Sequence, residues 1–240
     1  MEKQGIGGAE MRIEAFTEGT RQCKAFVCEQ PEFLLIQPVD ESDAAGLAQQ
    51  IEAMRERTDA PFALVAFSVG DWNGELSPWD APPVFGKTGF GHGAADTLAF
   101  ITETLLPHVR ARYEIGEDVP VILGGYSLAA FFALWATYRS DTFHAAAAAS
   151  PSVWFPGWME FAGTHECFAK CVYLSLGDRE ERAKNPVMAT VGDCIRQQHQ
   201  LLLDALGEES CTLEWNEGNH FKDPALRCAK AFAWCIEKLK

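Results

Sequence analysis

The sequence lacks several features that would assign it to a membrane, metal-binding or disulfide-rich class. No run of about 18 apolar residues occurs, the length that a membrane-spanning helix needs. The N-terminal segment MEKQGIGGAEMRIEAF has no apolar core of signal-peptide length. The eight cysteines include no Cys-x-x-Cys pair, and no histidine completes a zinc pattern with them. We therefore expect reduced, mostly buried thiols, a cytoplasmic location and no membrane partner.

Basic residues are also few, and this limits the classes of molecule that the protein is expected to bind. The chain has 20 Lys and Arg against 34 Asp and Glu, a formal net charge of −14. Such a surface repels phosphate backbones, so nucleic acid is not an expected partner. With 240 residues, 48% of them hydrophobic, and no linker or repeat, the chain is expected to form one domain over residues 1–240. Its oligomeric state stays open.

Short apolar runs alternate along the chain with longer stretches of helical period. We expect strands at about residues 32–39, 61–69, 119–125, 143–150, 171–177 and 211–218. We expect helices at about residues 43–57, 94–113, 127–139, 186–206 and 224–239. This order predicts right-handed crossovers and a three-layer α/β fold, a mostly parallel sheet flanked by helices. The long connection at residues 70–93, rich in Gly, Pro and Trp, is a candidate functional loop.

Ser127 stands where a predicted strand turns into a predicted helix, in the segment VILGGYSLAA. Ligands of open α/β sheets bind at the carboxyl ends of strands, which is where this serine is expected. The pattern Gly125-x-Ser127-x-Ala129 is close to the Gly-x-Ser-x-Gly nucleophile elbow. The backbone N–H of Leu128, at the helix N-terminus, would then face a developing oxyanion. On the motif alone, Ser127 could instead be an ordinary helix cap.

A histidine and a group of acids follow Ser127 in the chain order of α/β-hydrolases, serine, acid, histidine. His220 lies in the loop after the last predicted strand, from which an imidazole can reach Ser127. The loop after the preceding strand contains three acids, Asp178, Glu180 and Glu181. Any of the three could orient the imidazole. Because Arg179 and Arg182 stand between and beside these acids, the other two acids are expected to belong to a solvent-exposed cluster of charges.

Four segments, GGYSLAA, ASPSVWF, LSLGDREE and GNHF, resemble in this order the "putative esterase" family of α/β-hydrolases. The family includes S-formylglutathione hydrolases, feruloyl esterases, siderophore esterases and mycolyltransferases. The resemblance covers about residues 62–232. It implies Ser127 as nucleophile and His220 as base, and it ranks Glu180 first among the acids, three residues after the glycine that ends the strand. Ala129 departs from the family by replacing the second elbow glycine.

The resemblance also implies residues around the nucleophile. Ser150 and Pro151 match a family segment that lines the site. A second oxyanion donor is expected from the loop after the second predicted strand, where the candidates are the backbone N–H groups of Gly70, Asp71 and Trp72.

The expected function is a serine carboxylic ester hydrolase that acts on a small molecule through an acyl-enzyme, with no metal or organic cofactor. An acyltransferase with the same triad and a non-catalytic binding module on a hydrolase scaffold are the alternatives. Two segments that should overhang the site are rich in aromatic residues: Trp72, Trp79, Phe85, Phe90, Trp154, Phe155 and Trp158. We expect about half of these residues to belong to the hydrophobic core and not to the site. The acidic composition disfavours highly anionic substrates unless a local basic group, such as Lys87, reverses the field.

Overall fold

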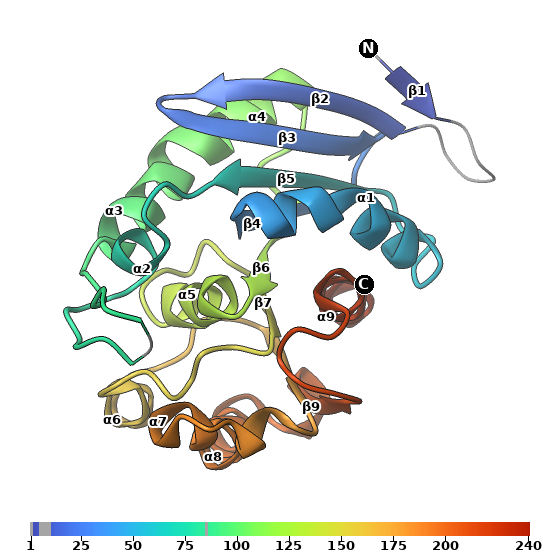
Figure 1. Cartoon of the computed structure of the whole chain (residues 1–240). Coiled ribbons are helices and arrows are strands. Elements are labelled where there is room, and N and C mark those ends of the chain that lie inside the picture. Colours follow the sequence, from blue (N-terminus) through green and yellow to red (C-terminus); the bar gives the residue numbers. More distant parts are fainter. Residues whose placement is uncertain (1, 5–10, 85) are drawn as a thin grey trace.

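The computed structural model describes residues 2–4, 11–84 and 86–240, and in these a single nine-stranded sheet is the central layer (Figure 1). The strand order is β1-β2-β3-β5-β4-β6-β7-β8-β9. The strands are β1 (Glu2–Gln4), β2 (Met11–Glu18), β3 (Arg21–Cys28), β4 (Phe33–Val39), β5 (Phe62–Ser68), β6 (Val121–Tyr126), β7 (Ala145–Ala149), β8 (Cys171–Gly177) and β9 (Cys211–Asn216). The strands from β4 onward pair in parallel, which confirms the predicted mostly parallel sheet.

Helices cover both faces of the sheet and complete the three predicted layers (Figure 1). They are α1 (Glu41–Arg55), α2 (Trp72–Glu75), α3 (Ala94–Ala99), α4 (Leu106–Tyr113), α5 (Leu128–Thr137), α6 (Trp158–Thr164), α7 (Pro186–Ala189), α8 (Val191–Leu206) and α9 (Pro224–Leu239). The apolar faces of α1 and α9 pack in one core, and those of α5 and α8 in the core on the opposite face. Among the described residues, no helix is long and apolar enough to span a membrane.

The N-terminal strands are the main feature that the sequence did not predict. β2 and β3 form an antiparallel hairpin around Gly19, which has a φ of +59°, and β3 pairs antiparallel with β5. β2 alternates apolar and polar residues and is only partly buried, so its apolar signal is weaker than that of the central strands.

Two predicted helices differ in detail from the structure. The helix expected at residues 94–113 contains a π-helical stretch, Phe100–Leu105, between α3 and α4. The helix expected at residues 186–206 is divided into α7 and α8. The expected burial of the cysteines is confirmed for seven of the eight, and Cys194 is partly exposed.

Small residues let α5 and α9 approach the centre of the sheet. β7 consists of five alanines, each fully buried, and it contacts both helices. In the neighbouring strand, a Cβ added at Gly124 would lie 2.7 Å from both Ala147 Cβ and Phe232 Cζ. No real Cβ tolerates such contacts without a shift of its neighbours. Position 124 therefore requires glycine if α9 is to lie where it does.

We expect Gly124→Ala to lower the free energy of unfolding by about 1–3 kcal/mol, because the extra methyl overpacks a rigid site between β7 and α9. Gly163→Ala is the matched control, since a Cβ there has no heavy atom within 4 Å and the residue lies within α6. The control should be neutral or stabilising by up to about 1 kcal/mol. Urea unfolding of both variants measures the difference, and equal stability of the two would contradict the packing argument.

Candidate active site

Ser127 occupies a strained turn between β6 and α5. Its φ of 57° and ψ of −118° lie in a region that residues with a side chain rarely adopt. A Cβ on Gly125 would lie 2.7 Å from Ala129 Cβ, so strand and helix meet closely. Ala129 therefore fits where the family has glycine, provided that position 125 stays glycine. Although Ser127 precedes the helix, its side chain makes no capping hydrogen bond, unlike an ordinary N-cap serine.

The Ser127 hydroxyl, the His220 imidazole and the Glu180 carboxylate form a continuous hydrogen-bonded series. His220 Nε2 lies 2.9 Å from Ser127 Oγ, and His220 Nδ1 lies 2.7 Å from Glu180 Oε2. An ionised carboxylate only accepts hydrogen bonds, so Nδ1 carries the proton and Nε2 accepts from the serine hydroxyl. The three residues follow β6, β8 and β9, whose carboxyl ends meet at one edge of the sheet.

The three acids of the loop after β8 have different partners, which separates the alternatives left open by the sequence. Asp178 Oδ1 accepts from the backbone N–H of Gly218 at 2.8 Å. Glu181 Oε2 pairs with Arg196 of α8 at 2.8 Å. Glu180 is the one that contacts His220.

Glu180 is buried, and each of its oxygens has hydrogen-bond donors. Oε2 contacts His220, while Oε1 accepts from the Gly177 N–H at 2.7 Å, from Ser150 Oγ at 2.9 Å and from Arg227 Nη1 at 2.8 Å. Burial alone would raise the pKa of Glu180, but the hydrogen bonds and the charge of protonated His220 outweigh it, and the pKa is lowered. The carboxylate is therefore held in its ionised form.

Arg227 of α9 is a buried cation behind this series that the sequence analysis did not identify. Its side chain is 2% exposed, and besides Glu180 it donates to the Tyr126 hydroxyl at 3.0 Å, to Ser150 Oγ at 3.0 Å and to the Asn219 carbonyl at 3.0 Å. The sequence does contain a sign that this arginine is buried, because position 227 falls on the apolar face of the amphipathic C-terminal helix. A charged residue there calls for a buried partner.

The loop after β5 differs from the expectation for the second oxyanion donor. The backbone N–H groups of Gly70 and Asp71 both donate to Glu75 Oε1, at 3.0 and 2.8 Å. Both donors are therefore occupied in this structure, which makes them weaker candidates for binding an oxyanion. Trp72, the first residue of α2, remains: its backbone N–H has no acceptor among the described residues. The same holds for the N–H of Leu128, the first residue of α5.

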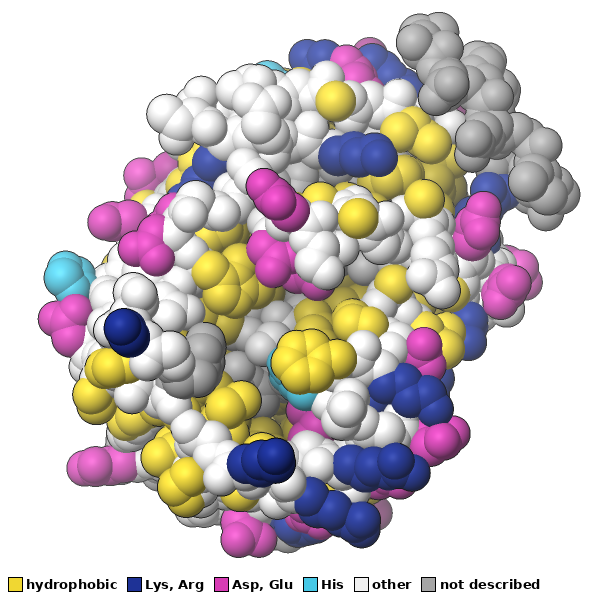
Figure 2. Space-filling model, viewed as in Figure 1, with side chains coloured by type: hydrophobic (Ala, Val, Ile, Leu, Met, Phe, Trp, Pro, Cys, Tyr) yellow, Lys and Arg dark blue, Asp and Glu magenta, His cyan; other side chains and the backbone are white. Residues whose placement is uncertain are grey.

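A cavity of about 720 Å³ opens over Ser127 and His220. Figure 2 shows the hollow in this face of the molecule, with hydrophobic side chains along its walls. The residues predicted from the sequence to line it, and found there, are Trp72, Phe90, Ser150, Pro151 and Trp154. Gly70 and Asp71 do not line it.

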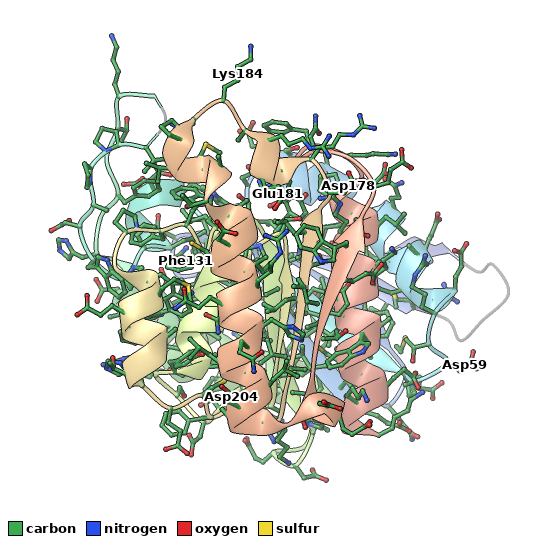
Figure 3. The ribbon with its side chains drawn as sticks, turned by 90° about the horizontal axis from the view of Figure 1, so that it is seen from below. Asp59, Phe131, Asp178, Glu181, Lys184 and Asp204 are labelled. Atoms are coloured by element: carbon green, nitrogen blue, oxygen red, sulfur yellow. The ribbon has the colours of Figure 1, made fainter. Side chains whose placement is uncertain are left out.

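The other predicted aromatic residues divide between the core and the undescribed part of the chain. Phe155 and Trp158 are buried and pack on Phe131 of α5, labelled in Figure 3, at ring distances of 4.9 and 5.0 Å. Trp79 packs edge-on against Phe155 and donates from Nε1 to the Pro156 carbonyl. Phe85 lies outside the described residues.

Comparison with known proteins gives one family and a set of similar folds. Residues 40–215 match the family described as "Putative esterase". Among curated proteins, none matches significantly. The solved structures with similar folds include the siderophore hydrolase EstB of Aspergillus nidulans, with a TM-score of 0.72, 16% identity, and coverage of 97% of each chain.

Two bacterial structures are also similar. An IroE-like serine hydrolase of Shewanella oneidensis has a TM-score of 0.68 at 14% identity, over 93% of this chain and 79% of that one. The enterobactin esterase FES of Shigella flexneri has a TM-score of 0.66 at 18% identity, over 94% of this chain and 58% of that one. At these identities the likeness shows the fold alone, which is that of α/β-hydrolases.

We expect Arg227→Met to lower the free energy of unfolding by about 3–5 kcal/mol, because it leaves the buried Glu180 carboxylate without its cation. The double variant Arg227→Met/Glu180→Gln should recover a large part of this loss, since it removes the uncompensated charge as well. Thermal or urea unfolding of the two proteins provides the comparison. A single variant as stable as the wild type would show that the pair contributes nothing to folding.

Proposed function

The chain belongs to the "Putative esterase" family, and from this premise we propose that it hydrolyses a carboxylic ester through an acyl-enzyme formed on Ser127. The membership confirms the resemblance noted in the sequence and makes the protein a serine hydrolase. The observation that carries the proposed mechanism is the series from Ser127 Oγ through His220 to Glu180, with distances of 2.9 and 2.7 Å, beneath an open cavity.

In the first half of the reaction, Ser127 Oγ attacks the ester carbonyl carbon while its proton passes to His220 Nε2. The carbonyl oxygen becomes an oxyanion, and the backbone N–H groups of Leu128 and Trp72 are our candidates to bind it. The tetrahedral intermediate then collapses. The bond to the alcohol oxygen breaks as His220 returns the proton to that oxygen, and the acyl group stays on Ser127.

In the second half, His220 accepts a proton from a water molecule, whose oxygen attacks the acyl carbon. Collapse of the second tetrahedral intermediate releases a carboxylic acid and returns the proton to Ser127 Oγ. Glu180 stays ionised through both halves and stabilises each imidazolium, because its own pKa is lowered by the hydrogen bonds around it despite burial. No metal or organic cofactor is needed for this sequence of steps.

We expect Ser127→Ala to lower kcat/KM for 4-nitrophenyl butyrate by at least about 10⁴-fold, because it removes the atom that forms the acyl bond. Ser152→Ala is the closest comparison, since Ser152 Oγ lies 3.4 Å from Ser127 Oγ. It should lose less than about tenfold, because it keeps the nucleophile. Initial rates of the two variants measure the difference, and a large loss in Ser152→Ala with activity retained in Ser127→Ala would reverse the assignment.

The acyltransferase alternative is tested by adding alcohols as acceptors. Transfer of most of the acyl group to the alcohol and not to water would favour an acyltransferase.

We expect Glu180→Gln to lower kcat by about 10³- to 10⁴-fold, because a neutral amide neither fixes the tautomer of His220 nor stabilises its charged form. Glu181→Gln changes the same side chain one residue away, where it contacts Arg196, and should retain kcat within about twofold. Equal losses in the two variants would refute these roles.

A further inference from the structure

Cations and anions are equal in number among the charged side chains that line the cavity, whereas the whole protein is strongly acidic. Among the described residues, four charged side chains line it: Asp40, Arg179, Glu180 and Arg182. Glu180 is compensated by Arg227, which lies 2.8 Å away in the buried interior. Asp40 caps α1 and accepts from the Asp43 N–H at 2.8 Å. Two cations against one capping anion therefore remain, in a chain whose formal net charge is −14.

The acids next to the two arginines have their shortest contacts with other groups. Glu181 pairs with Arg196 of α8, whereas Asp178 accepts from the Gly218 N–H and also forms a long ion pair of 4.0 Å with Arg179 Nε. Arg182 makes no ion pair with any described residue. The loop after β8 thus leaves Arg182 without an acidic partner among the described residues, and Arg179 with only one long ion pair, at a cavity that both residues line. Figure 2 shows Lys and Arg side chains along the lower rim of the hollow.

The larger part of the remaining wall of the cavity is apolar, although Asn73 and Asn219 also line it. Its large side chains are Trp72, Phe90, Trp154, Met188, Val191 and Phe221. Phe221, which follows His220 directly, is 84% exposed at the mouth. A cavity of about 720 Å³ has the size of sites that enclose small organic molecules. An apolar wall with two guanidinium groups at one end fits a molecule with an apolar body and an anionic end.

We propose that the substrate is an anionic ester, with an aromatic or other apolar body and a carboxylate that Arg179 and Arg182 bind at the mouth of the cavity. This inference rests on the proposed ester hydrolysis. Guanidinium groups suit the role because their planar donors match the two oxygens of a carboxylate. Lys87, the local basic group considered from the sequence, does not line the cavity.

The test uses pairs of esters that differ only in charge. 4-Acetoxybenzoate and 4-acetoxybenzamide place the charge on the alcohol side, and mono-4-nitrophenyl adipate and its terminal amide place it on the acyl side. We expect the wild type to prefer the charged member of one pair by about tenfold or more in kcat/KM. The pair that shows the preference identifies which side of the ester the arginines bind.

Variants then assign the preference to the arginines. Arg179→Gln/Arg182→Gln should lose most of it through a higher KM for the charged ester, while kcat/KM for the neutral ester stays within about twofold. Lys184→Gln is the matched control: it removes one positive charge from the same loop, but its side chain extends away from the protein (Figure 3) and does not line the cavity. It should keep the preference. Raising the salt concentration from about 0.05 to 0.5 M should weaken the preference, because exposed charges are screened.

Three results would overturn the inference, and they differ from failure of the proposed function. Equal hydrolysis of charged and neutral esters by the wild type would reject anionic recognition and leave ester hydrolysis standing. The same applies if the preference survives in the double variant or disappears equally in Lys184→Gln. If the folded wild type hydrolyses no ester and does not react with a fluorophosphonate, the proposed function fails, and the inference fails with it.

Discussion

The buried ion pair between Glu180 and Arg227 is the interaction on which the rest of the site depends. One oxygen of the carboxylate contacts Arg227 and the other contacts His220, so the pair joins α9 to the loop after β8 and to the imidazole. Arg227 also donates to the Asn219 carbonyl, next to His220, and to Tyr126, next to Ser127. A single buried cation therefore restrains the chain on both sides of the series Ser127, His220 and Glu180. Because neither charge is stable alone in this interior, site and fold form together.

The sheet supplies the second constraint by bringing three strand ends to one edge. The turns after β6 and β7 place Ser127 and Ser150 at positive φ, 57° and 47°, and such conformations persist only where surrounding contacts impose them. Backbone hydrogen bonds fix the two turns: the Ser127 N–H donates to the Ala149 carbonyl, and the Ser152 N–H donates to the Ser127 carbonyl. The hydroxyl of Ser127 is thus held on rigid backbone, with the cavity above it, rather than on a mobile loop.

The sequence predicted those parts of the structure that depend on local pattern or on chain order. The central strands and the position of Ser127 follow from apolar runs and small residues. His220 follows from its place after the last strand, while the choice of Glu180 came from the family resemblance. Other features depend on contacts between distant segments: Arg227 reaches Glu180 only when α9 packs on the sheet. The antiparallel pairing of β3 with β5 likewise has no local signature. The occupation of the Gly70 and Asp71 N–H groups by Glu75 is local, since it is a capping contact at the start of α2, and the sequence analysis did not identify it.

Three neighbouring serines line the cavity, Ser127, Ser150 and Ser152, and we propose that the hydroxyl of Ser127 is the nucleophile. Ser150 is bonded to Glu180 and Arg227, and Ser152 lies 3.4 Å from Ser127 without contacting His220. The most direct test is to react the folded protein with a fluorophosphonate and to map the adduct by peptide mass spectrometry. The account predicts one adduct per chain, on Ser127. An adduct on Ser150 or Ser152, or none on a folded protein that still hydrolyses esters, would contradict it.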